Sequence, residues 1–117
     1  MKILLVDDEE KFVSRLAERL ELRGFEAHWA TTCDGALYKA KTEYYDLAVL
    51  DVKMPRLSGI DLKKMLEKIN PDMKFIFITG HGSEEDYDMG TREGSFYIIK
   101  PFKIETLVEK IEQTLNL

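Results

Sequence analysis

The sequence has few of the features that would crosslink a chain or carry it through a membrane. Its 117 residues contain one cysteine, Cys33, which excludes a framework of internal disulfides and is typical of a reducing compartment. The longest unbroken apolar runs, such as Ile3–Val6 and Phe75–Ile78, are far shorter than the ~20 residues of a membrane-spanning helix. The first residues run directly into Asp7 and Asp8, unlike a signal peptide. We therefore expect a cytoplasmic protein with no membrane partner.

The sequence also lacks an excess of positively charged residues. The chain has 17 basic and 22 acidic side chains and a formal net charge of −5, so we expect no direct binding to nucleic acid. No stretch rich in proline, glycine or serine divides the sequence, and no internal repeat is present. Hydrophobic residues make up 44%, enough to build a core. The sequence thus predicts one domain over residues 1–117.

What the sequence does contain is an alternation of two patterns. Short apolar runs rich in β-branched and aromatic residues, typical of strands, occur at residues 3–6, 25–30, 47–50, 75–78 and 96–99. Segments with apolar side chains at helical spacing alternate with these runs, and predict helices over residues 12–23, 34–43, 59–70, 83–92 and 104–115. Four of the strand runs are almost continuously apolar, which favours strands that are covered on both faces.

Five repetitions of strand and helix predict an α/β fold, (βα)5. Right-handed crossovers place helices on both faces of a doubly wound, five-stranded parallel sheet, for which we expect the flavodoxin-like strand order 2-1-3-4-5. A barrel of eight such units would need about twice this length. Ligands of open parallel sheets bind beyond the carboxyl ends of the strands, so the residues that end the predicted strands are the candidates for a functional site.

Four of the five predicted strands end in a charged or hydroxyl side chain. These residues are Asp7 with Asp8, Asp51, Thr79 and Lys100. Three neighbouring carboxylates repel one another unless a cation lies among them, and an all-oxygen set suits Mg²⁺ or Mn²⁺ rather than zinc. With a lysine and a hydroxyl added, the set has the chemistry of a phosphoryl-transfer site, in which an ionised aspartate can attack directly.

Four pieces of the sequence resemble the receiver domain of two-component response regulators. They are Val6-Asp7-Asp8, Asp51-Val52-Lys53-Met54-Pro55 followed by Gly59, Thr79-Gly80, and Lys100-Pro101-Phe102. Each piece alone is a weak pattern, but all four occur in order and each stands at the end of a predicted strand. The resemblance implies a signalling switch that takes part in its own phosphorylation and dephosphorylation, and not a metabolic enzyme.

The resemblance also implies a role for individual residues at the phosphorylation site. Asp51 would be the phospho-acceptor, and Thr79 and Lys100 would bind the phosphoryl oxygens. Thr79 would then move inward and Tyr97 would rotate into the space it leaves, which would alter the face formed by the fourth helix, the fifth strand and the last helix. The peptide bond before Pro101 would be cis.

A metal site follows from the same resemblance. Asp8 and Asp51 would bind Mg²⁺ or Mn²⁺ directly, together with the backbone carbonyl of Lys53. Asp7 would act largely through a metal-bound water molecule.

The expected partners are a sensor histidine kinase or a histidine phosphotransfer protein, and a downstream effector domain or protein. A phosphorylation-dependent homodimer is also compatible with the family. The sequence is compatible with two arrangements of the native protein. In the first, the domain is the N-terminal piece of a larger regulator, which can be a transcriptional regulator. In the second, it is a free-standing receiver that acts in a phosphorelay or by protein contact.

Other classes fit the sequence less well. A Mg²⁺-dependent phosphohydrolase with an aspartate nucleophile would need an acid two residues after Asp51, where Lys53 stands, and a cap over its substrate. A flavodoxin-like electron carrier would need a phosphate-binding loop rich in Ser, Thr and Gly after the first strand, and none is present there.

Overall fold

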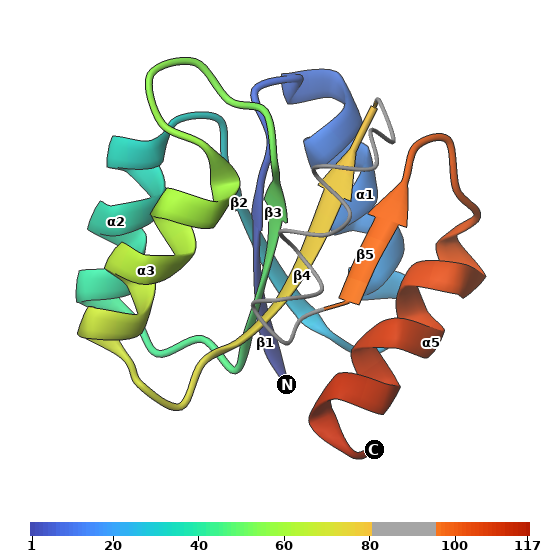
Figure 1. Ribbon diagram of the computed structural model, residues 1–117. Coiled ribbons are helices and arrows are strands. Elements are labelled where there is room, and N and C mark those ends of the chain that lie inside the picture. Colours follow the sequence, from blue (N-terminus) through green and yellow to red (C-terminus); the bar gives the residue numbers. More distant parts are fainter. Residues whose placement is uncertain (81–95) are drawn as a thin grey trace.

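The computed structural model describes residues 1–80 and 96–117, so the predicted helix over residues 83–92 lies outside the described residues. The strands form one parallel sheet in the order β2-β1-β3-β4-β5 (Figure 1). They are β1 (Lys2–Val6), β2 (Glu26–Ala30), β3 (Leu47–Asp51), β4 (Lys74–Thr79) and β5 (Phe96–Ile99). The predicted fold class and strand order are confirmed.

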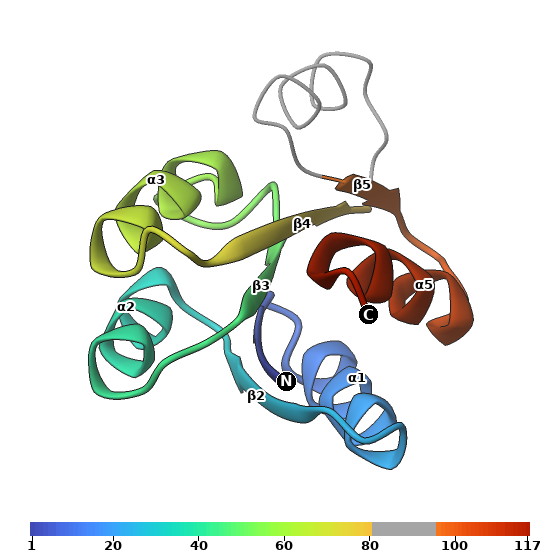
Figure 2. The same ribbon diagram turned by 90° about the horizontal axis from the view of Figure 1, so that it is seen from below.

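The described residues contain four helices. They are α1 (Glu10–Leu22), α2 (Cys33–Thr42), α3 (Gly59–Ile69) and α5 (Ile104–Leu115). Figure 2 shows α1 and α5 on one face of the sheet and α2 and α3 on the other. No helix in residues 1–80 or 96–117 is long and apolar enough to cross a membrane.

The bounds of α5 match the prediction, and those of α1, α2 and α3 differ from it by at most two residues. The apolar periodicity of the first helix starts at Phe12, whereas α1 begins at Glu10, because the first turn is polar and leaves no mark in the hydrophobic pattern. The starts of α2 and α3 have identifiable caps: the hydroxyl of Thr32 accepts from the N–H of Gly35 at 3.0 Å, and that of Ser58 accepts from the N–H of Asp61 at 3.1 Å.

The core consists of two apolar layers separated by the sheet. Side chains of a strand alternate between its faces, so Ile3 and Leu5 of β1 pack with α1 and α5, and Leu4 and Val6 pack with α2 and α3. Every residue of β3 is buried, because this central strand has a neighbour on each side and helices over both faces. This double burial explains why the strands read as continuous apolar runs.

Candidate functional site

The carboxyl ends of β1 and β3 bring three carboxylates together. Asp7, Asp8 and Asp51 each offer an oxygen atom, and these atoms all lie within 4.8 Å of one another. Asp7 is 0% exposed and Asp51 is 5% exposed, whereas Asp8 faces solvent. Carboxylate oxygens are the ligands preferred by hard divalent cations, so this acidic cluster can hold a metal ion.

The connection from β3 to α3 holds Asp51 in place. The N–H of Val52 donates to Ile78 O at 2.8 Å, and the N–H of Gly59 donates to Val52 O at 2.9 Å. A Cβ atom at Gly59 would lie 2.3 Å from the carbonyl oxygen of Asp51. Glycine is therefore required where the start of α3 returns to the end of β3. The N–H of Lys53 also donates to Asp51 Oδ1 at 3.1 Å.

Lys100 enters the acidic cluster from the end of β5. Its Nζ atom lies 2.6 Å from Asp7 Oδ2, 3.2 Å from Glu9 Oε1 and 4.0 Å from Asp51 Oδ2. Its backbone N–H donates to the Thr79 carbonyl oxygen at 2.7 Å, and the Lys100–Pro101 peptide bond is cis. Three segments that are far apart in the sequence thus converge as the strand pattern predicts; they carry Asp7 with Asp8, Asp51, and Lys100.

Glu9 is a residue of the site that the sequence reasoning missed. Its backbone N–H donates to Asp7 Oδ1 at 2.8 Å, and its carboxylate accepts from Lys100. The available signal was its position directly after the aspartate pair, at the N-cap of α1.

Burial and charge shift the pKa values of the converging groups. Burial, together with the charge of Asp7, raises the pKa of Asp51 to about 6, although the Lys100 ammonium and the Lys53 N–H oppose the shift. Burial also raises the pKa of Asp7, against the hydrogen bond from Lys100. For Lys100, burial favours the neutral amine, but hydrogen bonds and charges of the surrounding carboxylates outweigh it and raise the pKa. The lysine is therefore a cation at neutral pH, and Asp51 is easier to protonate than an ordinary aspartate.

Thr79 and Tyr97 lie on the neighbouring strands β4 and β5. Asp51 is the register partner of Ile78, so Thr79 is the next residue of β4, and it is fully buried. Tyr97 pairs with Phe77, and its half-buried ring packs against the layer under α2 and α3. Thr79 is thus beside the end of β3, and Tyr97 lies one strand further out.

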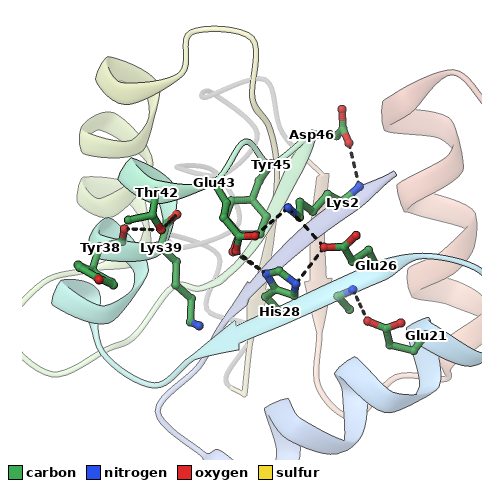
Figure 3. Close-up of polar contacts among 11 residues, drawn as sticks. Lys2, Glu21, Glu26, His28, Tyr38, Lys39, Thr42, Glu43, Tyr45 and Asp46 are labelled. Carbon is green, nitrogen blue, oxygen red and sulfur yellow. Dashed lines mark hydrogen bonds and ion pairs between the residues drawn. The ribbon is translucent and has the colours of Figure 1, made fainter.

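A second cluster of possible metal ligands lies at the other end of the sheet (Figure 3). Glu26 and Glu43 approach different ring nitrogens of His28, Nε2 and Nδ1, each at 3.1 Å. The Lys2 ammonium lies 3.3 Å from Glu26 and 3.0 Å from Glu43. The Tyr45 hydroxyl contacts His28 Nδ1 at 2.8 Å and donates to Glu43 at 3.2 Å. Because a lysine already pairs with both carboxylates, this cluster is a hydrogen-bond network that ties β2 to the segment after α2.

Comparisons with known proteins agree with this geometry. The family model described as the response regulator receiver domain matches residues 3–112. The alkaline phosphatase synthesis transcriptional regulatory protein PhoP of Bacillus subtilis (strain 168) is 36% identical over 116 residues, which cover 98% of this chain and 48% of the relative. The chain spans about half the length of the curated relatives it matches.

Two solved structures are close in fold. A response regulator receiver domain protein (CheY-like) from Methanospirillum hungatei JF-1 has a TM-score of 0.89 and 34% identity, with 98% of this chain and 93% of that chain covered. A response regulator from Burkholderia pseudomallei with a phosphorylated aspartic acid and a calcium ion has a TM-score of 0.87 and 28% identity, with 98% and 68% covered. The family match, the relatives and the acidic cluster at the sheet edge agree: this chain belongs to the response regulator receiver domain family of two-component signalling.

Proposed function

We propose that this chain accepts a phosphoryl group on Asp51 from a phosphorylated histidine of a sensor kinase or a histidine phosphotransfer protein. The observation that carries the proposal is the placement of the Asp51 carboxylate, which is buried beside two further aspartates and 4.0 Å from the Lys100 ammonium. The phosphorylated aspartic acid in the Burkholderia pseudomallei relative supports the same chemistry.

The transfer needs no separate general base. An oxygen of ionised Asp51 forms the new bond to phosphorus while the bond between phosphorus and the donor's histidine nitrogen breaks. The nitrogen keeps the electron pair of that bond. The Lys100 ammonium and the Thr79 hydroxyl are the groups that would donate to the phosphoryl oxygens as negative charge gathers on them.

The metal of the site would be Mg²⁺ or Mn²⁺, because its donors are carboxylate oxygens and two of them are buried. Asp8, Asp51 and the backbone carbonyl of Lys53 would hold the ion directly, and Asp7 would hold it through water. When bound, such an ion neutralises phosphoryl oxygens and reduces their repulsion from the aspartates. Asp7 meanwhile keeps its hydrogen bond to Lys100, which orients the ammonium.

The consequence of phosphorylation would be a change on the face formed by β5 and α5. Thr79 would move toward the phosphoryl group, and Tyr97 would turn into the space that the threonine leaves. Thr79 lies on β4, next to the strand of Asp51, and Tyr97 lies on β5, the next strand outward. This order of strands supports a route from the acceptor through Thr79 to this face. The phosphoryl group shifts the population of the two states because it contacts them differently.

A basic groove beside the site suits a partner that carries the phosphohistidine. It has a volume of about 330 Å³ and is lined by side chains of α1 and of the segment that leads into α5. Its basic lining residues are Lys11, Arg15 and Arg19, and its aromatic lining residues are Phe12 and Phe102. The groove is adjacent to Lys100, since the Lys100 ammonium lies over the Phe12 ring.

The domain would act in the cytoplasm as part of a larger regulator with a transcriptional output. The named functions of the relatives and the fact that the chain spans about half their length support this context. The alternative is a receiver that works alone in a phosphorelay or by protein contact.

The test is incubation with acetyl phosphate and Mg²⁺, followed by the mass of the intact protein. We expect the mass to increase by one phosphoryl group. The increase should not occur when EDTA removes the metal before the reaction, and it should not occur in Asp51→Asn. A protein that gains no phosphoryl group, or an Asp51→Asn variant that still gains one, would refute the proposed function.

A further inference from the structure

The Lys100 ammonium is held by three contacts on the side facing α1, two hydrogen bonds to carboxylates and one contact with an aromatic ring. Asp7 and Glu9 accept hydrogen bonds from it at 2.6 and 3.2 Å. The ring of Phe12 lies beneath it, with the centroid 4.4 Å from Nζ. The nearest Asp51 oxygen is 4.0 Å away, beyond hydrogen-bond distance. In the unphosphorylated protein, the lysine therefore bonds to carboxylates other than the acceptor.

These two carboxylates differ in their freedom to release the lysine. The side chain of Asp7 is 0% exposed, whereas that of Glu9 is 67% exposed. A buried carboxylate that loses its cation cannot be hydrated, but Glu9 can turn into water at little cost. Glu9 is thus the partner that Lys100 can leave when a more negative group forms on Asp51.

The placement of Glu9 is not explained by helix capping. It is the N-cap of α1, and its side chain makes no capping hydrogen bond. Serine, threonine, aspartate and asparagine are the residues that cap helices well. The Glu9 carboxylate instead reaches Lys100, which gives this residue a role at the site.

We propose that Glu9 is a positioning residue, which holds Lys100 toward α1 in the unphosphorylated protein and competes for its ammonium with a phosphoryl group on Asp51. The inference rests on the proposed function, because it concerns the state that phosphorylation creates. Glu9 thereby favours the unphosphorylated arrangement of Lys100. Removal of its charge shifts the balance toward the arrangement in which Lys100 binds the phosphoryl group.

The experiment measures the affinity of the whole chain for beryllofluoride, a tetrahedral mimic of a phosphoryl group on a carboxylate, by calorimetry at saturating Mg²⁺. Glu9→Gln keeps the length of the side chain and removes its charge. We expect this variant to bind beryllofluoride about two- to fivefold more tightly than the wild type, the factor that corresponds to a partly exposed ion pair. A merely structural role does not predict this gain, because loosening of the site would weaken binding.

Glu10→Gln is the matched control. Glu10 is the next residue, is exposed, and lies in the first turn of α1, so the substitution makes the same change in net charge beside the site. We expect Glu10→Gln to bind beryllofluoride with the same affinity as the wild type.

Three results would overturn the inference. If Glu9→Gln and Glu10→Gln increased the affinity for beryllofluoride equally, the gain would come from the change in net charge near the site and not from the contact between Glu9 and Lys100. Unchanged or weaker binding by Glu9→Gln, in a wild-type background that binds beryllofluoride, would mean that Glu9 does not compete for Lys100. Failure of the wild type both to bind beryllofluoride and to accept a phosphoryl group would instead refute the proposed function, and the inference with it.

Discussion

Lys100 donates to Asp7 at 2.6 Å although 93 positions separate the two residues in the chain. The pair joins the end of β1 to the end of β5, across the middle of the sheet. Because Asp7 is fully buried, its charge depends on this ammonium. The pair therefore holds the lysine beside Asp51 without placing it on the acceptor oxygen, from which it is 4.0 Å away.

Asp51→Asn should stabilise the metal-free protein at pH 7.5 by about 2 kcal/mol. The pKa of Asp51 is raised to about 6 in the folded protein, compared with about 4 in an unfolded chain. The folded state therefore binds an extra proton between roughly pH 4 and pH 6, and the free energy of unfolding falls as the pH rises through this window. Urea unfolding in EDTA at several pH values measures the effect.

The difference in the free energy of unfolding between Asp51→Asn and the wild type should fall toward zero near pH 4, because Asp51 of the folded wild type is already protonated there. Asp72→Asn is the control, since Asp72 is exposed. A stabilisation by Asp51→Asn that is independent of pH would contradict the burial and repulsion argument.

Mg²⁺ should raise the melting temperature at pH 7.5 and have little effect at pH 5. Protons compete with the metal for Asp51 below the pKa of about 6. A ligand present at about 100 times its Kd adds roughly 2.7 kcal/mol to stability, so the shift is measurable by calorimetry. Asp8→Asn should abolish it, because Asp8 is part of the acidic cluster; an undiminished shift in this variant would place the metal elsewhere.

Gly59→Ala should destabilise the protein by about 2 kcal/mol and weaken Mg²⁺ binding as well. The new Cβ would lie 2.3 Å from the Asp51 carbonyl oxygen, and either α3 or the end of β3 must move, at a cost typical of overpacking. Chemical denaturation and a Mg²⁺ titration measure the two effects. Gly80→Ala is the comparison for stability, because a Cβ at Gly80 would meet no atom of residues 1–80 or 96–117 within 4 Å. If both variants were equally stable, the close approach at Gly59 would not constrain the site.

Arg15→Glu should slow phosphotransfer from a histidine-phosphorylated partner at least severalfold, since it reverses one charge of the groove beside α1. Phosphorylation by acetyl phosphate should be unchanged, because this small donor does not need the groove. Lys39→Glu in α2 makes the same charge change on the opposite face of the sheet and should leave both rates unaltered. Loss of both reactions in Arg15→Glu would indicate damage to the site itself and not to a docking surface.

Strand ends and fold class could be predicted because they depend on local patterns. The run Leu47–Leu50 is apolar at every position because β3 is buried on both faces, and the charged residue that follows it must lie at the sheet edge. The same reasoning placed Asp7, Asp8 and Lys100 at that edge. The roles proposed for Thr79 and Tyr97 depend on a difference between two states of the protein, which a pattern of apolar and polar residues does not encode.

The sequence by itself determined that Asp7, Asp8, Asp51 and Lys100 meet. The carboxyl ends of parallel strands share one edge, and an apolar run is directly followed by Asp51, by Lys100 and by the pair of Asp7 and Asp8. Only the tertiary structure decided how those side chains pair. The choice of Asp7 and Glu9 as hydrogen-bond partners of Lys100, the 4.0 Å gap to Asp51 and the need for glycine at position 59 depend on differences of about 1 Å between elements that are remote in the chain. Hydrogen bonds and steric contacts change sharply over such distances, whereas a hydrophobic pattern does not register them.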